Sequence, residues 1–68
     1  MNLVKVISSD VDMIGYEDGF IVVQFLNGSI YKYPNCTQAM FNEFLAAPSK
    51  GKFVHQRLIP HSIPIRIR

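Results

Sequence analysis

The chain has 68 residues, of which 49% are hydrophobic, and its formal net charge is +2. This length allows a single domain, and the apolar content excludes a disordered segment. Cys36 is the only cysteine, which excludes an internal disulfide, and His55 and His61 have no evident third partner for a zinc ion. We therefore expect one domain over residues 1–68, with neither a metal nor another cofactor.

The start of the chain lacks the features of a targeting signal. Residues 1–6 contain neither a long apolar stretch nor a cleavage site. No run approaches the roughly 18 apolar residues that a membrane helix needs. A single free cysteine fits a reducing compartment. We expect a cytoplasmic protein with no membrane partner.

The charges are unevenly distributed. Residues 1–44 carry two lysines against five acidic residues, a net charge of −3, whereas residues 45–68 carry five basic residues and no acid, a net charge of +5. Such polarity can attract an anionic partner, but the two parts can equally pair with each other, within one subunit or between two. The basic residues of the last third are Lys50, Lys52, Arg57, Arg66 and Arg68.

Three strands are predicted in the first half, over residues 11–16, 20–26 and 29–33. The middle segment is the clearest, because it is dense in β-branched and aromatic residues. Asp18-Gly19 and Asn27-Gly28 separate the segments, and both dipeptides favour tight hairpin turns because their residues tolerate positive φ. The pattern therefore predicts a three-stranded antiparallel meander.

One or two short helices should follow the meander. Asn35 suits an N-cap, and Gln38 could reach back to it in a capping box. The apolar stripe of this first helix consists of Met40, Phe41, Phe44 and Leu45. Ser49 is a second N-cap candidate, ahead of a helix that Gly51 should keep short.

The C-terminal tail alternates isoleucine with polar residues, which predicts a short edge strand. Pro64 within it is tolerated at a sheet edge but not in a sheet interior. The expected fold is α+β: a three-stranded antiparallel meander, one or two short helices and a C-terminal edge strand. The alternating isoleucines are Ile63, Ile65 and Ile67.

The middle strand is apolar on both faces. Phe20, Val22 and Leu26 point one way, whereas Ile21, Val23 and Phe25 point the other. One layer of short helices can cover only one face, and an apolar face left over usually marks an interface. We therefore expect a homo-oligomer that associates through the sheet.

An ordered set of motifs over about residues 8–59 resembles the KTSC domain, a short module named for its occurrence at the C-terminus of some lysyl-tRNA synthetases and also found in free-standing bacterial and phage proteins. The resemblance brings no established activity, although RNA binding has been suggested for the family. The chain departs from the family pattern after the third strand, at His55 and in the tail. The matching motifs are Ser8-Ser9, Ile14-Gly15-Tyr16, Phe25-x-x-Gly28-x-x-Tyr31-x-Tyr33 and Ser49-Lys50-Gly51-Lys52-Phe53.

The strongest candidate site lies at the start of the second predicted helix. A capping serine, a glycine and free backbone amides can form a cradle for an anion, to which lysines add charge. The alternative is that the serine only caps, the glycine only packs and the lysines are solvated. The candidate phosphate-binding residues are Ser49, Lys50, Gly51, Lys52, His55 and Arg57.

Tyrosines on the sheet form a second candidate site. Tyr31 and Tyr33 share one face of their strand, and Tyr16 on the first strand could join them. Aromatic side chains on a sheet can stack with nucleic-acid bases. Packing in the core or at an interface would explain them equally well, since tyrosine favours strands.

No set of nucleophile, base and acid is visible in the sequence, so we expect a protein without enzymatic activity. Cys36 falls in the first turn of the first predicted helix, and we interpret it as a small buried residue. The preferred function is a small oligomeric protein that binds a phosphate-bearing ligand, either RNA or a nucleotide signal sequestered by a phage-type protein. The alternative is a protein-interaction or inhibitor module that docks through its apolar sheet face or basic tail.

Overall fold

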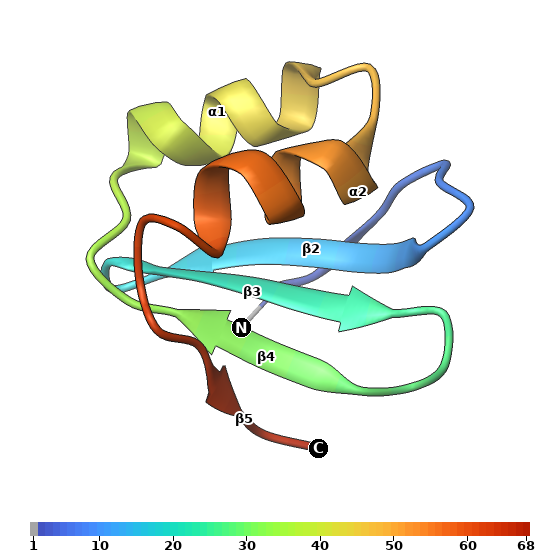
Figure 1. Cartoon of the computed structure of the whole chain (residues 1–68), viewed down its shortest axis with the longest axis horizontal. Helices are drawn as coiled ribbons and strands as arrows, with labels where there is room; N and C mark the ends of the chain where they lie inside the picture. The colour runs from blue at the N-terminus through green and yellow to red at the C-terminus, as the bar shows by residue number, and fades with distance from the viewer. Residues whose placement is uncertain (1) are drawn as a thin grey trace.

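The computed structural model describes residues 2–68. Met1, which is part of the predicted domain and of the segment searched for a targeting signal, lies outside the described residues. An antiparallel sheet with the strand order β1-β2-β3-β4-β5 carries helices on one side (Figure 1). This architecture confirms the α+β fold and the central meander. The elements are β1 (Val4–Lys5), β2 (Val11–Glu17), β3 (Phe20–Phe25), β4 (Ile30–Tyr33), α1 (Gln38–Ala46), α2 (Lys50–Phe53), the π-helical turn η1 (Val54–Leu58) and β5 (Ile65–Arg66).

The two hairpin turns differ in length. Asp18 and Gly19 both have positive φ, 50° and 82°, and close β2 onto β3 as a two-residue turn of the predicted kind. The second turn is longer than predicted, because residues 26–29 connect β3 to β4 and only Gly28 among them has positive φ. The Phe25 N–H closes this turn by donating to Ser29 O at 2.9 Å.

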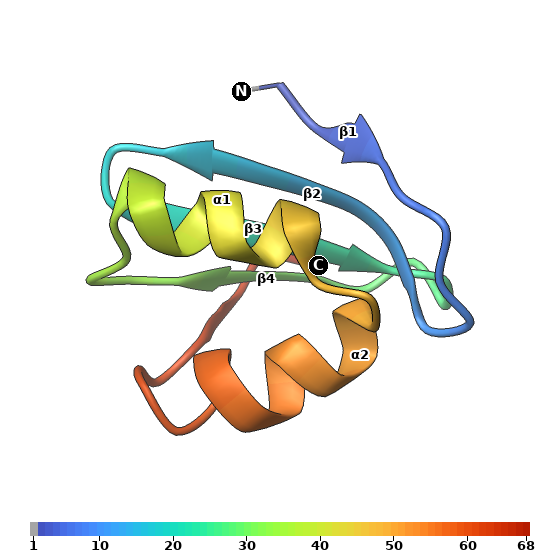
Figure 2. The same cartoon turned by 90° about the horizontal axis from the view of Figure 1, so that it is seen from above.

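Strand β1 was not predicted from the sequence. It pairs with β2 at one edge of the sheet (Figure 2), with Val4 opposite Ile14. Gly15 makes room for the residues that precede this strand, because an added Cβ would lie 2.7 Å from Asn2 O and 2.8 Å from Leu3 Cδ2. A two-residue strand leaves no periodic pattern in a sequence, so only the packing over Gly15 reveals it.

Helix α1 begins later than predicted. Its N-cap is Thr37, whose hydroxyl accepts from the Met40 N–H at 3.1 Å. Asn35 was the wrong N-cap because its φ is 60°, whereas an N-cap residue needs extended backbone. Gln38 does not form the predicted capping box, and its side chain donates to Asn42 Oδ1 instead.

The second helix begins where predicted. Ser49 is its N-cap, and the serine Oγ accepts from the Lys52 N–H at 3.2 Å. The α-helical part is short, as predicted, because α2 has four residues and then continues into the wider turns of η1. The Ile59 N–H donates to Val54 O at 2.9 Å, a hydrogen bond that spans five residues.

The core lies between the helices and the face of the sheet beneath them. Phe44 is fully buried and stacks on Phe53, with 4.8 Å between ring centroids. This stack joins α1 to α2, so one aromatic pair fixes how the two helices pack. The buried residues of this core are Val11, Ile14, Ile21, Val23, Tyr33, Cys36, Phe41, Phe44, Phe53, Val54 and Leu58.

The opposite face of the sheet is less open than the sequence suggested. Val22 faces away from the helices but is only 1% exposed, so residues of the same chain already cover the middle of this face. Lys32 contributes to that cover by placing its ammonium 4.2 Å from the centre of the Phe20 ring. The apolar surface open to self-association therefore lies at Leu26 and the exposed isoleucines around β5, and not at the middle of β3.

Candidate functional site

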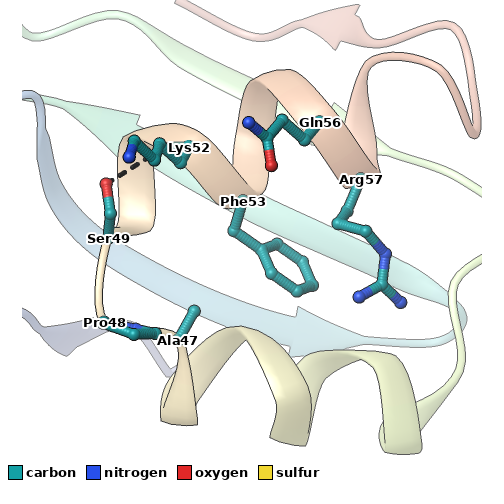
Figure 3. Close-up of a pocket in the computed structure, with 7 residues that line it drawn as sticks. All are labelled: Ala47, Pro48, Ser49, Lys52, Phe53, Gln56 and Arg57. Atoms are coloured by element: carbon teal, nitrogen blue, oxygen red, sulfur yellow. Dashed lines mark hydrogen bonds between the residues drawn. The ribbon is translucent and has the colours of Figure 1, made fainter.

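A groove of about 350 Å³ lies where α1 ends and α2 begins (Figure 3). The side chains of Phe53 and Arg57 point from the second helix toward α1, and Ser49 lies at the opposite end of the groove. The connection that follows α1, helix α2 and the turn η1 supply the lining residues. The lining residues are Ala47, Pro48, Ser49, Lys52, Phe53, Gln56 and Arg57.

The floor of the groove is apolar and its rim is basic. Phe53 is 7% exposed and belongs to the core, so its ring forms a fixed surface under the groove. Lys52 is exposed at the rim, and within residues 2–68 no carboxylate lies within 4 Å of its ammonium. The groove therefore presents an aromatic surface beside a cation that is available to a ligand.

Arg57 is held at the same rim by two contacts. Its guanidinium carbon lies 5.1 Å from the centre of the Phe53 ring, and Nη2 donates to Glu43 Oε1 at 3.2 Å. Both side chains of this ion pair are about half exposed, so the pair contributes only about 0–1 kcal/mol. Arg57 is therefore oriented toward an oxyanion, and a ligand can replace Glu43 at little cost.

The groove gathers only part of the predicted phosphate site. Ser49, Lys52 and Arg57 line it together, whereas Lys50, Gly51 and His55 do not. The Lys50 ammonium instead donates to the Ala47 and Leu45 carbonyl oxygens, at 2.6 Å and 3.1 Å, where α1 ends. His55 is exposed on the second helix outside the groove.

The backbone of Gly51 is not an open anion cradle. A Cβ added there would lie 3.5 Å from the carboxylate oxygen Oδ2 of Asp10, so an acid of this chain already lies at the helix start. That carboxylate would repel a phosphate at this position. The acidic and basic parts of the chain form an ion pair at Glu43 and Arg57, while Asp10 lies beside Gly51.

The three tyrosines share one face of the sheet, as predicted, but this face lies beneath the helices. Tyr33 is 3% exposed, and burial raises the pKa of its hydroxyl, with a further contribution from Tyr31. The Tyr16 hydroxyl donates to Cys36 O at 2.9 Å, and its ring packs 5.9 Å from that of Phe41. These contacts favour packing over base stacking for Tyr16 and Tyr33.

Tyr31 is the partly exposed member of the set. Its ring packs edge-on against Phe25, with 5.9 Å between centroids, and the Arg66 guanidinium lies 5.7 Å from its centre. An arginine therefore lies where a base would have to stack. The structure favours packing over base stacking for all three tyrosines.

Cys36 is buried, as predicted, but it precedes the N-cap Thr37 and so lies outside the first turn of α1. Burial raises the pKa of its thiol, while a hydrogen bond from the Ile21 backbone acts in the opposite direction. The Cys36 Sγ donates to Tyr33 O at 3.3 Å. This environment favours the thiol over the reactive thiolate.

We expect iodoacetamide to alkylate Cys36 much more slowly in the folded protein than in urea. A raised pKa lowers the thiolate fraction at any pH below it, and a 4% exposed side chain limits access of the reagent. Mass spectrometry of timed samples at pH 8 measures both rates. Equal rates for the folded and unfolded chains would contradict the buried placement.

Sequence reasoning missed Gln56, Phe53 and Glu43 as parts of this region. Phe53, Gln56 and Arg57 are spaced three and four residues apart, which places them along one side of a helix. That spacing was available in the sequence. The role of Glu43 was not, because it depends on how α1 packs against the second helix.

The described helices include none long and apolar enough to span a membrane. No match to this chain is found among curated proteins. A solved structure, that of a KTSC domain protein from Yersinia pestis, superposes with a TM-score of 0.88 at 27% identity, over 98% of this chain and 97% of the other. The model of the KTSC domain matches residues 7–61, which is most of the sequence. The chain therefore belongs to the KTSC domain family.

Proposed function

We propose that this protein is a non-enzymatic binder of a phosphate-bearing ligand, RNA or a nucleotide, and that the ligand occupies the groove between α1 and α2. The observation that supports this most directly is the pairing of a fixed aromatic floor, Phe53, with two cations at the rim, Lys52 and Arg57. The volume of about 350 Å³ falls in the range of small-molecule sites. A small ligand or one nucleotide of a strand matches that size.

The chemistry of the groove suits a ligand with one apolar and one anionic part. An apolar group would lie against Ala47, Pro48 and the exposed edge of Phe53, since Phe44 and Arg57 already cover most of that ring. Its phosphate would meet the Arg57 guanidinium, whose planar set of donors matches two oxygens of an oxyanion. The side-chain amide of Gln56 offers both a donor and an acceptor for the polar edge of the ligand.

Glu43 supports the assignment of Arg57, because its carboxylate already occupies one oxyanion position of the guanidinium. A phosphate monoester that displaced it would carry more negative charge than the carboxylate and so bind the guanidinium more strongly. Glu43 would then compete with the ligand in the free protein. This competition leads to a test in which one substitution weakens binding and another strengthens it.

We expect K52Q/R57Q to weaken binding about tenfold or more, because hydrogen bonds to charged groups contribute about 1.5–3 kcal/mol each. Glu43→Gln should tighten binding, since it frees Arg57. Isothermal titration calorimetry against single-stranded RNA, single-stranded DNA and mononucleotides, linear and cyclic, measures both effects. For a bound strand, the logarithm of the binding constant falls linearly with the logarithm of the salt concentration. The loss of two phosphate contacts should reduce the magnitude of that slope by about 1.4, at about 0.7 for each contact.

Variants that each remove one charge elsewhere serve as controls. Lys5→Gln removes a positive charge at the far edge of the sheet, and Asp18→Asn removes a negative charge in a turn, as Glu43→Gln does in α1. Both controls should bind as the unaltered protein does. The proposal fails if no ligand of the panel binds, or if K52Q/R57Q has no larger effect than Lys5→Gln.

The second candidate is self-association through the region of β5, in line with a protein-interaction role. Ile63, Ile65 and Ile67 are 86%, 52% and 50% exposed and follow one another along an edge of the sheet. A second copy that covered them would remove this apolar surface from water. Sedimentation equilibrium at micromolar concentration should show a dimer or larger species that Ile65→Lys reduces, and a monomer alone would contradict the idea.

A further inference from the structure

We propose that Arg66 and Arg68, together with the turn between β3 and β4, form a second phosphate-binding site, independent of the groove between the helices. The two arginines come from the C-terminal strand region, and the turn brings polar residues beside them. The depression between them has a volume of about 340 Å³. Its lining consists of Asn27, Gly28, Ser29, Arg66 and Arg68.

The backbone holds the arginines at the turn. The Ile67 N–H donates to Ile30 O at 2.8 Å, and the Ile30 N–H donates to Arg68 O at 3.1 Å. These hydrogen bonds join the C-terminal segment to the first residue of β4, directly after the turn. The sheet therefore fixes the distance between the arginines and the turn, although they are far apart in the sequence.

Arg66 is oriented before any ligand binds. Its Nε donates to Arg68 O at 3.1 Å, and its guanidinium lies over the Tyr31 ring at 5.7 Å. These contacts occupy the Nε–H and one face of the guanidinium plane. They leave the two terminal amino groups free to bind two oxygens of a tetrahedral anion.

The turn contributes a further donor and an open approach. Asn27 Oδ1 accepts from both the N–H and the hydroxyl of Ser29, at 3.0 Å and 2.7 Å. These two hydrogen bonds fix the orientation of the Asn27 amide group. Its Nδ2 donors have no partner in the described chain. Gly28 has no side chain, and the position of a Cβ there is open space to 4 Å. A ligand can therefore reach the turn without displacing a side chain.

The charges around the depression favour an anion. Lys5 is paired with Asp12 and Arg57 with Glu43, whereas in the part of the chain that the structure describes no Asp or Glu side chain lies within 4 Å of Arg66 or Arg68. Two arginines and an amide thus line the depression without an acidic side chain beside them. A phosphate group is the chemistry that such donors recognise, as a terminal monoester or as a diester within a strand.

Titration of the 15N-labelled protein with inorganic phosphate tests this site residue by residue. Ionic strength is held constant with chloride, and the readout is the set of NMR signals from the Gly28 and Ser29 amides and from the arginine Nε–H groups. We expect saturable shifts at these positions. In R66Q/R68Q the Gly28 and Ser29 shifts should be lost or require at least about tenfold more phosphate.

K52Q/R57Q removes the same charge from the groove between the helices and should leave the Gly28 and Ser29 shifts unchanged, which separates this site from the proposed function.

Titrations with adenosine monophosphate and with a short RNA lacking terminal phosphates distinguish a monoester from a diester, and saturation at the turn by either supports the site. Shifts that do not saturate, or that persist in R66Q/R68Q, would overturn it. Amide spectra of each variant verify that it is folded.

Discussion

Replacing Phe44 with alanine is expected to destabilise the domain by about 3–5 kcal/mol, the usual cost of truncating a buried phenylalanine. The side chain is fully buried and stacks on Phe53 at 4.8 Å, so the change leaves a cavity where α1 meets α2. Domains of this length have a total stability of about 3–10 kcal/mol. The variant should therefore be largely unfolded at 37 °C.

Urea denaturation followed by circular dichroism measures this loss. Leu45→Ala is the matched control, because Leu45 is the next residue of the same helix but is 42% exposed. The control should lose far less, since a large part of its surface is already in water in the folded protein. Similar midpoints for Phe44→Ala and Leu45→Ala would contradict the placement of Phe44 in the core.

Gly15→Ala should also destabilise the protein, by about 1–3 kcal/mol, although it adds a single methyl group. The new Cβ would lie 2.7 Å from Asn2 O and 2.8 Å from Leu3 Cδ2, closer than non-bonded atoms approach. The oxygen belongs to the backbone, so the segment around β1 must move away from β2. Hydrogen exchange should then accelerate at the Val6 amide, which donates to Asp12 O at 3.1 Å.

The same substitution at Gly51 should have the opposite effect and stabilise the protein. There an added Cβ would meet Asp10 at 3.5 Å, an ordinary contact, and the residue lies inside α2. Alanine exceeds glycine in helix propensity by about 1 kcal/mol, so Gly51→Ala should raise the urea midpoint. If both substitutions lowered the urea midpoint, the predicted difference between the surroundings of Gly15 and Gly51 would be contradicted.

Local signals in the sequence predicted the elements that depend on neighbouring residues. Asp18-Gly19 predicted a tight turn because both residues tolerate positive φ, and the observed values of 50° and 82° confirm it. Ser49 predicted a helix start because its hydroxyl can bind an amide three residues on. The same reasoning failed at Asn35, where the turn after β4 imposes a φ of 60° on a residue that could otherwise cap.

The two lysines of the candidate site could not be distinguished from neighbouring residues alone. Lys50 and Lys52 are alike in sequence, but Lys50 binds the carbonyl oxygens at the end of α1 and Lys52 remains at the rim of the groove. Which lysine is available depends on how α2 packs beside the end of α1, where Phe44 stacks on Phe53. No pattern in residues 49–52 contains that information.

The α+β class, the meander, the capped second helix and the basic character of the last third could be predicted from the sequence, because propensity, capping and charge act over a few residues. Which basic residues are available to a ligand depends on tertiary contacts. Glu43 meets Arg57 and Asp10 meets Gly51 through contacts between distant segments. Arg66 and Arg68 reach the β3–β4 turn only because their segment pairs with β4 at the edge of the sheet.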